Sequence, residues 1–164
     1  MKKFLFFVLF FYILILVQNS FLSHFSFDGV FLNIILIALV LLNFFEDPRK
    51  KTSVLAAAIG GFYLDIFSDF YIGTSMAILI LISFLAKKTL SILDKRSILD
   101  FIFVFLLVFA GYNLGIYFLD SVLKLSLSMS FLKRLGFLSM ICNLIFGLIA
   151  FSFFKYVLEK IRKT

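Results

Sequence analysis

The sequence predicts an all-α membrane protein, a bundle of six transmembrane helices. Of its 164 residues, 63% are hydrophobic and only 15% are charged, whereas a soluble domain is about half apolar with about a quarter of its residues charged. The apolar residues gather in six stretches of about 20 residues, the length that a helix needs to cross a bilayer. A soluble enzyme, a nucleic-acid-binding module and a disordered tail are therefore excluded.

Short polar or charged connections separate the six predicted spans. The first three cover residues 4–22, 29–45 and 52–67, and the charged turn 46–51 separates the second from the third. The last three cover residues 72–86, 98–119 and 135–158. What remains is two short tails and five short connections, which are too small for an extramembrane domain. We therefore expect a single integral membrane domain over residues 1–164.

The basic residues predict the orientation. With the N-terminus inside, only Lys124, Lys133 and Arg134 of the 16 Lys and Arg residues fall on the outer side. Basic residues collect on the cytoplasmic side of a membrane protein. The net charge of +7 is thus explained first by topology, and we expect a multi-pass membrane protein with both termini in the cytoplasm.

Asp65 is the most informative position for function. It lies about 13 residues into the third span and so roughly 20 Å from the cytoplasmic end, where an unpaired carboxylate is costly. One interpretation is a binding or proton-handling group. The other is a structural anchor that hydrogen-bonds neighbouring helices and is satisfied by Tyr, Asn or an outer-loop cation. We favour the structural interpretation, because no second buried charge accompanies Asp65.

Small residues predict close helix packing at two places. The run 56–61 carries small residues four apart, and Gly111 and Gly115 form a GxxxG motif, which lets helix backbones approach each other. Between these glycines, Asn113 is a candidate for hydrogen bonding between helices. Single amides also occur in or beside other spans, at Asn33, Asn43 and Asn143, and we expect each to bond a neighbouring helix.

Two outer segments leave their interpretation open. Residues 125–131 alternate apolar and polar side chains, as a half-buried strand does, and residues 20–28 mix Ser with Phe around His24. Two interpretations explain both segments equally well. Each could lie in the membrane interface, or each could form part of an outer rim that docks a partner protein.

The sequence carries no recognisable catalytic or metal-binding set. One Cys and one His are too few for a disulfide framework or an ordinary structural zinc site, and no phosphate-binding glycine loop follows a strand. We therefore expect no enzymatic activity, no cofactor and no metal.

Five features of the first four spans match one known family. Gln18 closes the first span, Asn33 opens the second, and the short charged turn 46–51 follows. The third span contains Gly61-x-x-x-Asp65, and a further glycine, Gly73, comes after a short outer turn. With these residues, the stretch from 16 to about 86 resembles MreD, the rod shape-determining membrane protein of bacteria.

The resemblance implies a non-enzymatic scaffold of the cell-elongation machinery. Such a protein joins MreC and the peptidoglycan glycosyltransferase and transpeptidase pair to the MreB cytoskeleton. The implied fold is a six-helix bundle similar to the substrate-binding subunits of energy-coupling-factor transporters. The candidate structural or partner-binding residues are Asp65, Gly61, Gly73, Gln18, Asn33, Gly111, Asn113 and Gly115.

The alternative is a vitamin-binding subunit of an energy-coupling-factor transporter with the same fold. Such subunits dock their coupling subunit through small residues on the first helix, and residues 4–17 contain no Gly, Ala or Ser. A vitamin pocket also needs several polar groups that converge near the outer side. Asp65, Asn113 and the outer loops supply a few such groups.

Overall fold

All regular structure in the described part of the chain is helical, as the sequence predicts. The computed structural model describes residues 2–20, 32–47, 50–68, 71–93, 97–123 and 137–163. Its helices are α1 (Lys2–Ser20), α2 (Ile34–Phe45), α3 (Thr52–Ile66), α4 (Thr74–Ile92), α5 (Ile98–Leu123) and α7 (Phe137–Lys163). The segments 20–28 and 125–131, whose roles the sequence leaves open, lie outside the described residues apart from Ser20.

Three of the described helices are long and apolar enough to cross a membrane. The qualifying stretches are Thr74–Ile92 in α4, Ile98–Leu119 in α5 and Leu138–Lys160 in α7. The other three helices have shorter apolar stretches, Phe4–Ser20, Ile34–Phe45 and Thr52–Ile66. Helix α2, with its 12 residues, is about 18 Å long at 1.5 Å per residue. That length falls well below the ~30 Å of a hydrocarbon core.

Several helix ends differ from the predicted span boundaries by four to six residues: the start of α2 and the ends of α4, α5 and α7. The second helix begins at Ile34, because Asn33 is its N-cap and its side chain accepts a hydrogen bond from the Leu36 amide. The fourth helix continues past Ala86 to Ile92. Lys87, the first charge after the apolar run, is a good helix former, so it ends the apolar run without ending the helix; its amine pairs with Glu46.

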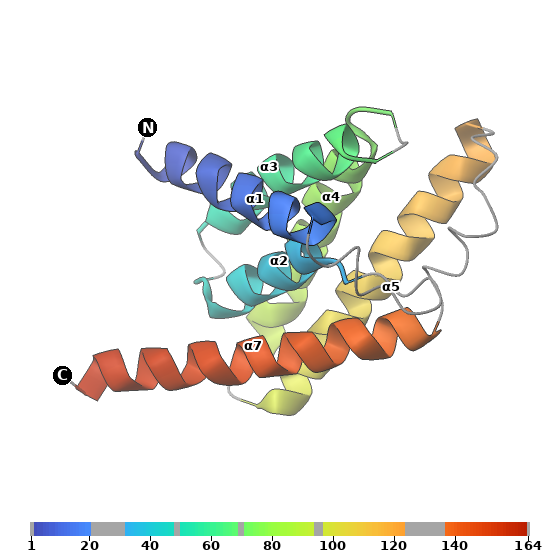
Figure 1. The fold of residues 1–164 in the computed structure, drawn as a ribbon. Coiled ribbons are helices and arrows are strands. Elements are labelled where there is room, and N and C mark those ends of the chain that lie inside the picture. The colour runs from blue at the N-terminus through green and yellow to red at the C-terminus, as the bar shows by residue number, and fades with distance from the viewer. Residues whose placement is uncertain are drawn as a thin grey trace.

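Helix α2 is the centre of the arrangement. It packs against every other described helix, whereas the main contacts of α7 are with α2 and α5. In Figure 1, α7 runs along one side of the molecule, and the start of α1 and the end of α7 point to the same side of the view. The residues of α2 are accordingly almost all buried.

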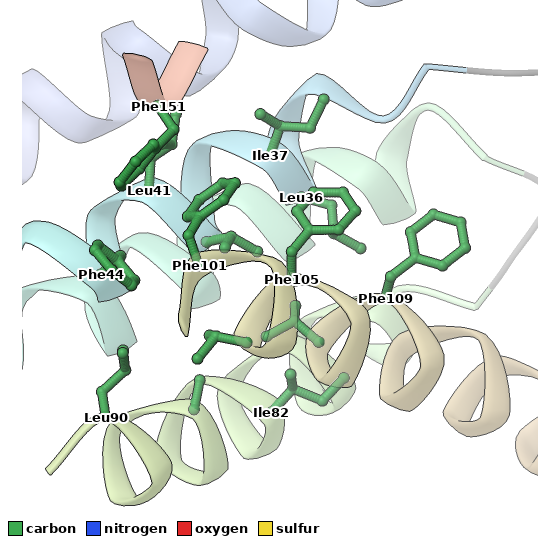
Figure 2. Packing of buried hydrophobic residues seen from close by; sticks show 14 of the residues in the cluster. Leu36, Ile37, Leu41, Phe44, Ile82, Leu90, Phe101, Phe105, Phe109 and Phe151 are labelled. Atoms are coloured by element: carbon green, nitrogen blue, oxygen red, sulfur yellow. The ribbon is translucent and has the colours of Figure 1, made fainter. Parts of the chain in front are cut away.

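Two apolar clusters lie around α2. The first joins α2 to α4, α5 and α7 and is rich in Phe, as Figure 2 shows. Phe101 of α5 stacks on Phe151 of α7 with ring centroids 4.5 Å apart, and Phe44 of α2 meets both rings edge-on. The second cluster joins α1, α2, α3 and α4, mainly through aliphatic and small side chains with two Phe residues from α1.

Large apolar side chains also cover the outside of the molecule. Leu5 of α1, Leu114 of α5 and Phe153 of α7 are each about two-thirds exposed. In a soluble protein such continuous apolar surface marks an interaction site, and it is also the surface that a bilayer would cover.

Candidate functional site

Asp65 caps the N-terminus of α4. It sits in the last turn of α3 and is 2% exposed. One carboxylate oxygen accepts a hydrogen bond from the amide of Ser75 at 2.7 Å, and the other accepts from the amides of Gly73 at 2.8 Å and Met76 at 3.3 Å. These amides have no partner within α4, and a negative charge is favoured at a helix N-terminus.

The structural role that we favoured for Asp65 fits this geometry, but the carboxylate meets backbone amides where the sequence argument expected a Tyr or Asn side chain. The outer-loop cations, which were the third expected partner, lie outside the described residues. Tyr112 of α5 joins the group indirectly, through its hydroxyl 3.4 Å from the Ser75 hydroxyl. The chain reverses between the end of α3 at Ile66 and the start of α4 at Thr74, which brings the amides back to the carboxylate.

Two glycines of the predicted motif make this turn possible. At Gly61, an added Cβ would lie 2.4 Å from the Met76 Cα, so α3 and α4 touch backbone to backbone at this point. Gly73 has φ 104°, a left-handed conformation that side-chain-bearing residues rarely adopt, and it is the N-cap of α4. The structure thus brings Gly61, Asp65 and Gly73 together in one helical hairpin.

Gln18 and Asn33 meet at the N-terminus of α2. The side chain of Gln18 accepts from the Ile34 amide at 2.9 Å, and that of Asn33 accepts from the Leu36 amide at 3.0 Å. Asn143 of α7 completes the group by accepting from the Asn33 amide at 2.8 Å. Side chains from α1 and α7 thereby satisfy the amides at the start of α2.

A third group of this kind lies at the N-terminus of α3, and the sequence argument missed it. Glu46 directly follows α2 and accepts from the amides of Thr52 at 3.1 Å and Ser53 at 2.8 Å. Lys87 near the end of α4 donates to the same carboxylate at 2.9 Å, and it also donates to the carbonyl of Lys50. The sequence did contain a signal for this cap: Glu46 is an acidic residue a few positions before a predicted helix start, where a negative charge is favoured.

The environment of Glu46 favours its charged form. Burial on its own raises the pKa, but the hydrogen bonds from Lys87, Thr52 and Ser53 outweigh burial and lower the pKa from 4.5 to about 2. Glu46 is therefore a carboxylate at neutral pH, and the pair with Lys87 is neutral overall.

The GxxxG motif packs within the chain. Gly111 and Gly115 of α5 face α4, where added Cβ atoms would lie 3.5 Å from Ile82 and 2.9 Å from Ile78. Asn113 is half-buried, and in the described part of the chain it makes no hydrogen bond to a neighbouring helix. The reason is geometric: residues two apart on a helix do not share a face, so Asn113 points away from the stripe that meets α4.

Asn43 makes the contact between helices that the sequence argument assigned to the single amides. Its Nδ2 donates to the Leu39 carbonyl at 2.9 Å and to Ser83 Oγ of α4 at 3.3 Å. It therefore links the last turn of α2 to the middle of α4 in the buried interior.

The three polar groups share one chemistry. At the starts of α2, α3 and α4, side-chain oxygens from elsewhere in the chain accept hydrogen bonds from the first backbone amides. These groups hold helices in place, because their acceptors are already occupied by the protein's own backbone.

Comparison of the chain with protein-family models, with curated proteins and with solved structures finds no match in any of the three.

Proposed function

We propose that the chain is a non-enzymatic membrane scaffold of the bacterial cell-elongation complex, as the resemblance to MreD implies. In this proposal it crosses the cytoplasmic membrane six times with both termini inside. It joins an MreC-like protein and a peptidoglycan glycosyltransferase and transpeptidase pair to MreB filaments. The proposal takes its partners from the resemblance and its physical support from the positions of the residues that carry that resemblance.

The observation that carries the proposal is that these residues form two contact sites between helices. Gln18 and Asn33 meet at the start of α2, and Gly61, Asp65 and Gly73 meet at the start of α4. A motif that carries out chemistry would bring reactive groups to a shared cavity. Here the motif fixes how α1 to α4 pack, as expected of a protein that presents a rigid surface to partners.

The capping also supports membrane embedding of the shorter helices. Hydrocarbon offers no water to the unpaired amides at a helix start, so protein groups must satisfy them. The starts of α2, α3 and α4 are satisfied in this way by Asn143, Glu46 and Asp65. Helix α2 is further enclosed by the other helices, so it does not need to match the bilayer thickness by itself.

The contacts between helix ends support the alternating topology. Glu46 at the end of α2, Thr52 at the start of α3 and Lys87 near the end of α4 meet in one group. The ring of Phe45 in α2 also stacks on that of Phe154 in the second half of α7. These ends are the ones that the basic residues assign to the cytoplasmic side.

Depletion of the protein in its own rod-shaped host tests the proposal. We expect rounded cells, which a wild-type copy restores, and co-purification of an MreC-like protein from detergent extracts. An Asp65→Ala copy should give less of the assembled complex, whereas a Ser152→Ala copy, changed at an exposed position of α7, serves as the control.

Two results would contradict the proposal. One is normal cell shape together with lost uptake of a labelled vitamin, which would favour the transporter subunit. The other is an Asp65→Ala protein that accumulates and assembles normally while a measured catalytic turnover disappears.

A further inference from the structure

The side chain of Asn113 is a polar group inside an apolar helix. Asn113 follows Ile98, the first residue of α5, by 15 positions, which places it about 22 Å along the helix. A hydrocarbon core of ~30 Å that begins near Ile98 therefore contains it. Within the described residues, its amide makes no hydrogen bond. Hydrocarbon offers no water to such a group, so a hydrogen bond to another helix would stabilise it.

Asn113 belongs to a stripe of residues along one face of α5, which we call the Asn113 stripe. Its members follow one another in alternating steps of three and four residues, the period of about 3.5 with which two helices coil around each other. The members are Phe103, Leu106, Ala110, Asn113 and Tyr117. Phe103, Ala110 and Tyr117 are exposed, and the other two are half-buried. The stripe is thus accessible to a further helix.

Other faces of α5 already pack within the chain. Gly111 and Gly115 face α4, and Phe101 and Phe105 belong to the cluster that includes residues of α2 and α7. In Figure 1, the later half of α5 lies at the edge of the described helices. The exposed members of the Asn113 stripe take no part in these contacts, so this face of α5 can meet a second protein.

We propose that the Asn113 stripe joins two copies of this chain in the membrane, with their α5 helices parallel. The two Asn113 amides meet across a two-fold axis, and each donates a hydrogen bond from Nδ2 to the Oδ1 of the other. Ala110, one turn earlier on the stripe, is small enough for the two backbones to approach each other there. The side chains of Phe103 and Tyr117 pack above and below this crossing point.

The chemistry of the amide favours a second copy over a different partner. An amide carries both a donor and an acceptor, so an identical amide across a two-fold axis supplies what it lacks. All copies of the chain insert in the same orientation, and their Asn113 side chains therefore lie at the same depth. A single Asn at such a position also fixes the register and the number of helices in coiled coils.

The proposal requires only that α5 crosses a membrane. It uses none of the residues on which the scaffold function depends, apart from Asn113 itself. A monomeric chain that still maintains cell shape would overturn the dimer alone, and a dimer in cells whose shape does not depend on the protein would overturn the scaffold function alone.

Energy transfer between fluorescently labelled full-length chains in liposomes tests the proposal. Stepwise dilution with lipid gives the dissociation constant of the dimer. Asn113→Leu keeps a side chain of similar size and removes both hydrogen bonds, so it should weaken the dimer roughly tenfold, which corresponds to about 1.4 kcal/mol. Asn113→Gln keeps an amide and should retain most of the affinity. Circular dichroism of each variant separates a lost dimer from a lost fold.

A matched pair of variants tests the close approach of the two helices. Ala110→Phe places a ring at the crossing point and should weaken the dimer at least as much as Asn113→Leu does. Ala77→Phe places the same ring at an exposed position of α4 and should leave the dissociation constant unchanged.

Cysteine cross-linking in membranes locates the interface. With the native thiol removed by Cys142→Ala, Ala110→Cys and Tyr117→Cys should each form a disulfide between two chains. Leu81→Cys, at an exposed position of α4, should form none.

Four outcomes would overturn the proposal. The first is a wild-type chain that stays monomeric at the highest ratio of protein to lipid, and the second is a dimer that neither Asn113→Leu nor Ala110→Phe weakens. The third is cross-linking through Leu81→Cys as efficient as through Ala110→Cys. The fourth is a photo-crosslinker at position 113 that captures a different protein, and no second copy, in cell membranes.

Discussion

Asp65 and Glu46 cap the starts of consecutive elements of the fold in two different ways. Each carboxylate accepts hydrogen bonds from the first amides of the helix that comes next in the chain, α4 for Asp65 and α3 for Glu46. Glu46 also binds the amine of Lys87. In the part of the chain that the structure describes, the carboxylate of Asp65 meets only backbone amides.

The difference teaches how this chain holds a charge in an apolar interior. Glu46 lies in a connection next to exposed residues, where a Lys can reach it from the end of another helix. Asp65 is almost fully enclosed and depends on the amides and on the favourable dipole at the start of α4. Removing Asp65 therefore leaves several amide donors without an acceptor at once. The side chains of Lys87 and Glu46 are also largely buried, with about a tenth of each exposed, but each retains other protein hydrogen bonds when its partner is removed.

The largest effect is expected for Asp65→Ala. It removes the acceptor from the buried amide of Ser75 and the partly buried amides of Gly73 and Met76, and leaving a buried donor unpaired costs about 1–3 kcal/mol. We expect a loss of roughly 3–5 kcal/mol in the free energy of unfolding, measured by SDS titration in mixed micelles. Asp65→Asn keeps one acceptor oxygen and should lose about half as much. Equal stability of Asp65→Ala and the wild type would show that the cap is unimportant.

Gly61→Ala should have the next largest effect. Its Cβ would lie 2.4 Å from the backbone of Met76, so α3 and α4 must separate, which weakens the cap by Asp65. Such overpacking costs about 1–3 kcal/mol. The matched control is Gly111→Ala, whose Cβ would lie 3.5 Å from a flexible Ile82 side chain. Thermal melting in detergent should show a clear decrease only for Gly61→Ala; equal melting temperatures would contradict the close approach.

The pair of Glu46 and Lys87 should make stability depend on acid. Because the folded pKa of Glu46 is about 2, below its ordinary value of 4.5, its contribution is complete above about pH 5 and is lost as the pH falls toward 2. Glu46→Gln should reduce the free energy of unfolding at pH 7 by about 2 kcal/mol and flatten this acid dependence. Melting curves between pH 3 and pH 7 measure both effects.

Lys87→Met gives the sharper comparison. It removes one of the interactions that lower the pKa of Glu46, so the folded pKa should lie closer to 4.5. The acid-dependent part of the stability should therefore be smaller than in the wild type, and its loss should be complete at a higher pH. The exposed neighbour Lys88→Met should leave the acid dependence unchanged. An identical acid dependence for Lys87→Met and the wild type would show that the hydrogen bonds from the amides are sufficient to lower the pKa of Glu46.

The sequence predicted the helices better than the contacts of the site. Apolar runs located all the described helices, because their length and composition depend on local sequence. Glu46 and Lys87 are 41 positions apart, and Asn33 and Asn143 are 110 apart, so no local pattern connects them. Asp65 was recognised as costly to bury, but its partners are amides, which every residue except proline carries and which the sequence cannot mark.

Neutral caps at the start of α2 should have the smallest effects. Gln18→Ala and Asn143→Ala each leave one amide, that of Ile34 or Asn33, without its side-chain acceptor. We expect each to lose about 1 kcal/mol, the usual value of a neutral helix cap, and neither loss should depend on pH. Ser152→Ala on the exposed side of α7 is the control and should lose almost nothing. If either neutral cap proved as important as Asp65, enclosure of the amides would matter more than the charge of the acceptor.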